Sequence, residues 1–253
     1  MEPKYKRVLL KLSGEAIARK NDDGTVSEIF DDVLIDGIVG SIRKLLEQGI
    51  QVAVVIGAGN IWRGKYGKNM RRARADHMGM LGTVMNCLKL EDSLERAGIP
   101  ARVLSPIQMN SFTEQYDFRR AEEYLENGKV VLLGCGTGMP YVTTDTAVVV
   151  RAAEISADVI LMAKNIDGVY ERDPRDSRGN IDPSVKRYRK ISYQESLERD
   201  LKATDAYATM LAKEQKIDMY IFALSDPDNV YKAACGENIG TLVSSENIES
   251  ETY

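Results

Sequence analysis

Short apolar segments alternate with longer amphipathic segments along most of this chain, and this alternation constrains the fold more than any other feature. The short segments, rich in Val, Ile and Leu, are expected to be strands at residues 7–12, 51–56, 101–104, 129–133, 158–163 and 219–222. The longer segments carry apolar residues at helical spacing and are expected to be helices at residues 30–48, 76–97, 118–126, 144–156 and 205–216. Strands that are apolar on both faces and separated by helices favour a parallel sheet buried on both sides. We therefore predict an α/β fold, a three-layer sandwich whose central, mainly parallel sheet is covered by helices on both faces.

The composition is ordinary for a soluble globular protein. The 253 residues are 43% hydrophobic and 28% charged, and a chain of this size can bury one large core. No apolar run approaches the roughly 20 residues that cross a bilayer, and no signal peptide is evident, so we expect a cytoplasmic protein that does not bind membranes. Three widely spaced cysteines without a CxxC pattern argue against disulfides and zinc. A net charge of −4 argues against broad binding to nucleic acid.

The first expected strand ends in a lysine that is followed by a small, flexible turn, Lys11-Leu12-Ser13-Gly14-Glu15. Anions bind where backbone N–H groups converge without side-chain bulk, and a lysine beside them adds a point charge. Taken alone, a strand that ends in a solvated lysine and a glycine turn is the commoner arrangement. Two more glycine-rich loops, at residues 57–60 and 134–140, follow strands that should end at the same edge of the sheet, where such sheets bind ligands. The three loops together indicate a phosphate site.

Two common nucleotide-binding patterns are incomplete in this chain. Residues 59–66 come within one residue of the P-loop, but Tyr66 stands where that loop needs the short hydroxyl side chain that ligates magnesium. Met139 stands where a GxGxxG motif begun at residue 134 would need its third glycine. We therefore expect neither a P-loop nor a Rossmann cofactor site.

Five motifs follow one another over nearly the whole chain. They are Lys11-Leu12-Ser13-Gly14-Glu15; Val55-Ile56-Gly57-Ala58-Gly59-Asn60 with Arg63-Gly64; Asp76-His77-Met78-Gly79-Met80-Leu81; Gly136-Thr137-Gly138 with Thr143-Thr144-Asp145; and Asp167-Gly168-Val169-Tyr170 with Asp173-Pro174. In this order they resemble the bacterial uridylate kinases of the amino acid kinase superfamily. The resemblance implies phosphoryl transfer from ATP to UMP in pyrimidine nucleotide biosynthesis, with Mg²⁺ accompanying ATP and with a homohexamer as the assembly. It also implies a single domain over residues 1–253, with an acceptor half at about 1–157 and an ATP half at about 158–253.

The resemblance assigns roles to individual residues. It implies an ATP site made by Lys11, Leu12, Ser13, Gly14, Gly59, Arg63, Asn165, Tyr170 and Asp173. It implies a UMP site made by Ala58, Asp76, Thr137, Gly138, Met139, Pro140, Tyr141, Val142, Thr143 and Thr144. The catalytic residues would be Lys11, Arg63 and Asp205, with Asp205 orienting Lys11 rather than acting as a base; metal ligands are not identified. No base is needed, because a phosphate oxygen is already a nucleophile and catalysis reduces to positioning and charge neutralisation.

Alternatives stay open at this point. Asp76 stands where a helix is expected to begin, so it could cap that helix. The chain could be a related kinase with another phosphate acceptor, against which Asp76 and the threonine-rich loop argue. It could also be a nucleotide-binding metal storage or scaffold protein on the same fold, against which the joint presence of Lys11, Arg63 and Asp205 argues.

We expect this protein to respond weakly or not at all to GTP, which activates many members of the family it resembles. Residues 20–27 hold only one glycine, Gly24, and do not match the glycine-rich segment associated with that effector. Asp22 and Asp23 would also repel a triphosphate. Initial rates at subsaturating UMP, with and without GTP at fixed free Mg²⁺, test this expectation. A several-fold rise with GTP would show that an effector site lies elsewhere.

Overall fold

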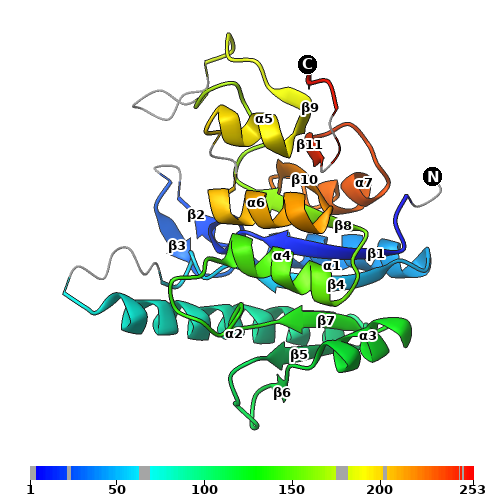
Figure 1. The fold of residues 1–253 in the computed structure, drawn as a ribbon. Helices are drawn as coiled ribbons and strands as arrows, with labels where there is room; N and C mark the ends of the chain where they lie inside the picture. The colour runs from blue at the N-terminus through cyan, green and yellow to red at the C-terminus, as the bar shows by residue number, and fades with distance from the viewer. Residues whose placement is uncertain are drawn as a thin grey trace.

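The computed structural model describes residues 4–21, 24–62, 69–174, 182–201, 204–244, 246 and 248–253. Within these residues the chain forms one ten-stranded sheet with the order β12-β9-β11-β10-β8-β1-β4-β7-β5-β6 (Figure 1). Its strands are β1 (Arg7–Leu12), β4 (Gln51–Ile56), β5 (Ala101–Ser105), β6 (Glu114–Gln115), β7 (Val130–Leu133), β8 (Val159–Lys164), β9 (Tyr188–Ser192), β10 (Asp218–Ala223), β11 (Thr241–Ser244) and β12 (Glu251–Thr252). A separate hairpin is made by β2 (Arg19–Lys20) and β3 (Val26–Glu28).

The sheet is mainly parallel, as the sequence predicts. All neighbouring pairs from β10 to β6 run parallel, whereas β11 pairs antiparallel with β10 and β12 pairs antiparallel with β9. β1 lies in the middle, between β4 on one side and β8 on the other. The strands that follow β1 in the chain are thus first added on the side of β4, and later strands, from β8 on, are added on the opposite side of β1. Ligands bind at the carboxyl ends of the strands where the strand order reverses in this way.

Helices cover both faces of the sheet (Figure 1). One face carries α1 (Asp32–Glu47), α2 (Arg72–Arg96) and α7 (Asn229–Ala234), and the other carries α3 (Phe118–Glu126), α4 (Thr144–Glu154), α5 (Tyr193–Glu198) and α6 (Ala206–Gln215). Successive side chains of a strand point to opposite faces. Accordingly, Val8 and Leu10 of β1 belong to the first core and Leu9 to the second. The three-layer sandwich is confirmed.

The start of α2 differs from the sequence-based expectation. This helix begins at Arg72, with Arg71 as its N-cap residue, and not at residue 76. Its charged first turn, Arg72-Ala73-Arg74, hides the apolar spacing by which a helix is recognised. Asp76 therefore lies in the second turn of α2, and the hypothesis that it caps the helix is wrong.

Several short elements were not expected from the sequence. They are the β2–β3 hairpin, the strands β6, β9, β11 and β12, the helices α5 and α7, and a short 3₁₀ helix at Gly14–Ala16. Their few residues do not show a clear period, and edge strands such as β12 are too polar to resemble buried strands. Gly24 lies at the tip of the hairpin with φ of +80°, while Asp22 and Asp23 lie outside the described residues. Among the described helices, none combines the length and the apolar character that crossing a membrane requires.

Candidate active site

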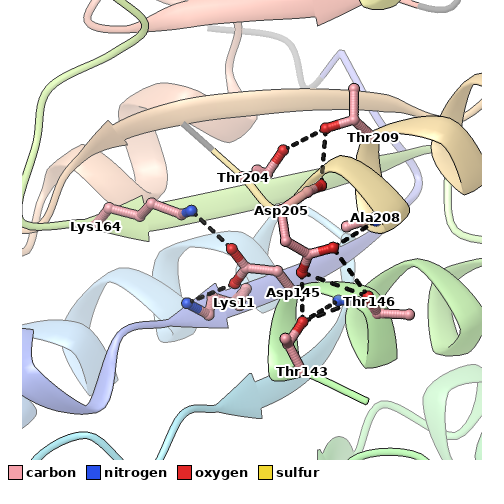
Figure 2. A network of polar contacts seen from close by, with 9 residues as sticks. All are labelled: Lys11, Thr143, Asp145, Thr146, Lys164, Thr204, Asp205, Ala208 and Thr209. Atoms are coloured by element: carbon pink, nitrogen blue, oxygen red, sulfur yellow. Dashed lines mark hydrogen bonds and ion pairs between the residues drawn. The ribbon is translucent and has the colours of Figure 1, made fainter. Parts of the chain in front are cut away.

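Two lysines and one aspartate form a network of ion pairs at the carboxyl ends of the central strands (Figure 2). Lys11 lies on β1, and Lys164 is the last residue of the neighbouring strand β8. Asp145, in the first turn of α4, lies between them, with Oδ1 3.0 Å from Nζ of Lys11 and Oδ2 2.9 Å from Nζ of Lys164. All three side chains are largely buried, with 9% of Lys11, 18% of Asp145 and 15% of Lys164 exposed. Two positive charges and one negative charge are therefore concentrated at the switch point of the sheet.

The ionisation of this network follows from its geometry. Burial by itself raises the pKa of Asp145, but the ammonium groups of Lys11 and Lys164 outweigh it and hold the pKa of this carboxyl well below its usual range. Burial lowers the pKa of Lys164, and the charge of Lys11 acts in the same direction, while Asp145 opposes both. Asp145 is thus an anion at neutral pH and offsets the repulsion between the two lysines.

Asp205 holds the starts of two helices, α4 and α6. It is the N-cap residue of α6, and its Oδ1 accepts a hydrogen bond from the N–H of Ala208 at 2.8 Å. The same carboxylate accepts from the hydroxyls of Thr143, the N-cap residue of α4, and of Thr146 (Figure 2). The carboxylate paired with Lys11 in this structure is that of Asp145, so the expected role of Asp205 in orienting Lys11 stays a prediction.

Gly14 allows the turn after β1 to lie very close to the turn after β4. A Cβ atom at Gly14 would lie 2.1 Å from the carbonyl oxygen of Gly57, so a larger residue would push the turns apart. Leu12 faces the core and is 1% exposed. The N–H of Ser13 donates to the carbonyl oxygen of Ala163 at 3.1 Å. Two of the residues predicted to bind phosphate here thus also stabilise the fold, Leu12 by packing in the core and Ser13 by bonding to β8.

A reciprocal pair of amides anchors the turn after β4 to α2. Nδ2 of Asn60 donates to Oδ1 of Asn86 at 3.0 Å, and Nδ2 of Asn86 donates to Oδ1 of Asn60 at 2.9 Å. The same two nitrogens also donate to carbonyl oxygens, Asn86 to Gly57 at 2.7 Å and Asn60 to Ile29 at 2.8 Å. Buried amides need such partners. The pair therefore fixes the glycine-rich turn relative to the long helix.

A cavity of about 790 Å³ opens beside Lys11. Its walls include Lys11, Ser13, Glu15, Lys164, Asn165, Tyr170 and Asp173. Residues predicted for the ATP site from two distant parts of the chain thus meet at one cavity, and cofactor sites commonly measure about 300–1,000 Å³. A second cavity, of about 460 Å³, shares Lys164 and Asp200 with the first and extends to Asp145 and Asp205.

Asp76 joins α2 to the loop at residues 137–144, where the acceptor site is predicted. Its Oδ1 accepts from Nε of Arg72 at 2.7 Å, and its Oδ2 accepts from the backbone N–H of Tyr141 at 2.9 Å. Tyr141 has φ of +68°, and the side chains of Tyr141 and Met139 are 69% and 63% exposed. The structure thus brings the two predicted acceptor segments together, although they lie far apart in the sequence.

The remaining predicted residues have the following surroundings. Ala58 packs on α2, since a Cβ atom at Gly82 would lie 2.9 Å from the Cβ of Ala58. Gly59 lies against Glu15, whose Cγ would be 2.9 Å from an added Cβ. Within the acceptor loop, the hydroxyl of Thr137 accepts from the N–H of Met139, Gly138 has φ of +79°, and Pro140, Val142 and Thr144 complete the segment. Arg63 lies outside the described residues.

Arg151 anchors the start of the acceptor loop (residues 137–144) at Gly136, and no sequence motif indicates this role. Its Nε and Nη2 donate to the carbonyl oxygen of Gly136 at 3.3 and 2.9 Å. Its Nη1 pairs with Glu154 at 2.6 Å, and its guanidinium group lies 3.8 Å from the centre of the Tyr116 ring. Gly136 has φ of +56°, so the buried arginine fastens a backbone turn that most residues would avoid.

Lys164 and Asp145 were also not assigned from the sequence, although both left a signal. Lys164 ends an apolar strand, which is the pattern that drew attention to Lys11. Asp145 is the last residue of the quoted motif Thr143-Thr144-Asp145, where an acidic residue in the first turn of a helix has an ordinary explanation in the helix dipole. Only the adjacency of β1 and β8 reveals that the two strands end in one charge network.

Comparisons with known proteins identify the family of this chain. The sequence pattern of the Amino acid kinase family matches residues 6–223. The chain is similar to the crystal structure of UMP kinase from Bacillus anthracis, with 35% identity, a TM-score of 0.88, and coverage of 98% of this chain and 99% of that one. UMP kinase from Ureaplasma parvum is 34% identical, with a TM-score of 0.86 and coverage of 95% and 99%. Uridylate kinase from Archaeoglobus fulgidus is 27% identical, with a TM-score of 0.72 and coverage of 94% and 99%. From its sequence and its fold, the chain belongs to the amino acid kinase family.

Proposed function

We propose that this protein transfers the γ-phosphoryl group of ATP to UMP and so produces UDP and ADP for pyrimidine nucleotide biosynthesis. The observation that carries the proposal is the Lys11–Asp145–Lys164 network, which connects the cavity of the predicted ATP residues to the helix that follows the predicted UMP loop. Similarity to two UMP kinases at 34–35% identity over nearly the whole chain supports UMP as the acceptor.

In this proposal ATP occupies the 790 Å³ cavity with its phosphates toward Lys11. Asn165, Tyr170 and Asp173 would hold its adenosine half. UMP would lie between Asp76 and residues 137–144, so that its phosphate reaches the lysine pair from the start of α4. From the resemblance of the five motifs to the uridylate kinases we also propose a homohexamer, with the acceptor half at about residues 1–157 and the ATP half at about 158–253.

The transfer requires positioning and charge neutralisation rather than a base. A bond forms between a phosphate oxygen of UMP and the γ-phosphorus, and the bond from that phosphorus to the bridging oxygen breaks, leaving the electron pair on ADP. Lys11 and Lys164 would neutralise the negative charge that develops on the moving group. Asp145 would keep the two ammonium groups in place, and Asp205 would keep the starts of α4 and α6 in place.

The residues beside Lys11 suit a magnesium ion that arrives with ATP. Among the described residues there is no group of three or more His, Cys, Asp or Glu that could enclose a metal ion. The cavity wall does offer hard oxygen atoms on Ser13 and Glu15. Mg²⁺ prefers oxygen ligands and commonly binds through one or two protein groups together with phosphates and waters. When bound, the ion would offset phosphate charge.

A coupled ADP-release assay with UMP, CMP, dUMP and GMP tests the proposal. We expect UMP to be the best acceptor. The variant Lys11→Met should stay folded and bind UMP but lose about 10²–10³-fold in turnover, which is the usual cost of removing one preorganised charge. Lys44→Met, at an exposed position on α1, is the matched control and should keep full turnover.

Each other result of this assay has a definite meaning. Turnover with a different acceptor and none with UMP would identify a related kinase. ATP binding without any turnover would identify a storage or scaffold protein. Near-normal turnover in Lys11→Met would refute the placement of the phosphate site.

Asp145→Asn should reduce both turnover and stability, because it leaves two buried ammonium groups without their counter-charge. Breaking a buried pair costs about 3–5 kcal/mol, and each kcal/mol lowers the melting temperature of a chain this size by about 2–4 °C. The double variant Asp145→Asn/Lys164→Met should recover part of the melting temperature, because one unbalanced charge is removed, but not the turnover. Equal turnover in Asp145→Asn and wild type would contradict the role given to this carboxylate.

The lowered pKa of Asp145 predicts how the stability of the protein changes in acid. Its pKa is lower in the folded protein than in the unfolded chain. Its contribution is therefore fully present above the ordinary carboxyl pKa of about 4 and is lost as the pH falls from there toward the folded value. Melting temperatures measured from pH 7 down to pH 3 should fall less steeply in Asp145→Asn than in wild type.

Asp76→Asn should weaken UMP binding much more than ATP binding. A neutral amide accepts hydrogen bonds from a ribose diol, from Arg72 and from the N–H of Tyr141 less strongly than a carboxylate does. Thermal melting with each nucleotide alone measures the difference. The same small loss for both nucleotides would show that Asp76 serves only the local structure of α2.

A further inference from the structure

We propose that residues 251–253, here called the brace, hold the donor loop (residues 165–174) in the shape that binds ATP, and that Tyr253 is the positioning residue. The contacts of Tyr253 with Arg187, and of Arg187 with Asp167, carry this inference. It rests on the proposed function, because the donor loop is where we place the adenosine half of ATP.

The brace is fastened to the edge of the sheet at both of its ends. β12 pairs antiparallel with β9, and the carboxylate of Glu251 pairs with the guanidinium group of Arg189. At the other end, the N–H of Tyr253 donates to the carbonyl oxygen of Arg187 at 3.0 Å. The hydroxyl of Tyr253 donates to the carbonyl oxygen of Gly240 at 2.9 Å. The ring of Tyr253 is thus held in one place although it is 50% exposed.

A chain of contacts leads from this ring to the donor cavity. The guanidinium carbon of Arg187 lies 4.3 Å from the centre of the Tyr253 ring, a distance suited to a cation–π contact. Nη1 of Arg187 pairs with the carboxylate of Asp167 and also donates to the carbonyl oxygen of Asp167 at 3.1 Å. The hydroxyl of Tyr170 in turn donates to Oδ1 of Asp167 at 2.8 Å. Tyr170 lines the donor cavity.

The donor loop packs tightly against the aliphatic part of the Arg187 side chain. A Cβ atom at Gly168 would lie 2.4 Å from Oγ1 of Thr241 and 2.9 Å from Cδ of Arg187. The N–H of Val169 donates to Oγ1 of Thr241 at 2.9 Å, and the N–H of Tyr188 donates to the carbonyl oxygen of Val169 at 2.8 Å. Tyr170 and Arg187 also form an isolated antiparallel bridge. A change in the side-chain position of Arg187 would therefore be transmitted to the backbone of the loop.

Because the brace lies at the edge of the sheet, its loss should affect the donor loop without lowering the stability of the whole protein. β12 is the outermost strand of the sheet and has only two residues. Neither core cluster includes Tyr253. Loss of its ring should therefore loosen the donor loop and leave the central strands unchanged, as expected for a region of low local stability.

Two substitutions and two measurements test the proposal. Tyr253→Ala removes the ring, whereas Tyr253→Phe removes only the hydroxyl and keeps the ring over Arg187. Phe118→Ala is the matched control, because its ring is 40% exposed and lies 5.3 Å from the guanidinium carbon of Arg119, on α3 at the other side of the molecule. For each variant, amide hydrogen exchange of the ligand-free protein is measured, together with the Kd for ATP and for UMP.

We expect Tyr253→Ala to raise the Kd for ATP about two- to fivefold, the size of effect that one exposed cation–π contact can have. Exchange should accelerate within residues 165–174 and not in β8, and the Kd for UMP should not change. Phe118→Ala should behave as wild type does, and Tyr253→Phe, which keeps the ring but loses the bond to Gly240, should show a smaller effect than Tyr253→Ala.

The contrary results are equally specific. Unchanged exchange in residues 165–174, or faster exchange across the whole sheet, would overturn the proposal. An equal rise of the Kd for ATP and for UMP would do so as well. A wild-type protein that binds no ATP would refute the proposed function instead, while the exchange data would still decide whether residues 251–253 hold the donor loop.

Discussion

The site depends on a single carboxylate, Asp145, which lies between two ammonium groups and offsets their repulsion. Lys11 and Lys164 come from adjacent parallel strands, so the sheet itself brings their charges together. Like charges repel most strongly where water is excluded, and both side chains are largely buried. The carboxylate of Asp145 makes this arrangement tolerable, and it can do so only because α4 begins at the carboxyl ends of β1 and β8. The strand order, the start of α4 and the charge balance therefore depend on one another.

α4 connects several parts of the site. The hydroxyl of Thr143, its N-cap residue, donates a hydrogen bond to the carboxylate of Asp205, and Asp205 in turn caps α6. Its first turn supplies Asp145, and a later turn supplies Arg151, which fastens the carbonyl oxygen of Gly136. The acceptor loop thus has one end bonded to this helix and the other end continuous with it. A rigid helix in this position can keep two ligand loops in register, because positional errors of about 1 Å are costly in group transfer.

The fold could be predicted from the sequence because its central strands are continuous apolar runs and its long helices have a clear period. The meeting of the glycine-rich turns at one edge of the sheet could be predicted for a similar reason, since these turns follow parallel strands. Individual contacts could not be predicted. Which carboxylate pairs with Lys11 depends on where α4 begins relative to β1 and β8, and the order of the elements in the chain does not reveal this. The sequence does not reveal the start of α2, because its first turn is charged, or the burial of Arg151, because arginine is typical of surfaces. The roles of the individual nucleotide-binding residues stay predictions.

The paired amides of Asn60 and Asn86 make two distant positions of the chain mutually dependent. Each side chain uses its oxygen for the other and its nitrogen both for the other and for a backbone carbonyl. An aspartate at either position would set a carboxylate against a carbonyl oxygen. Spontaneous deamidation or a single-base exchange at one of them would therefore weaken the attachment of the glycine-rich turn to α2, even though neither residue is predicted to contact a substrate. Two residues that are 26 positions apart in the chain therefore tolerate substitution only together, because each amide satisfies the other while it also holds a backbone carbonyl.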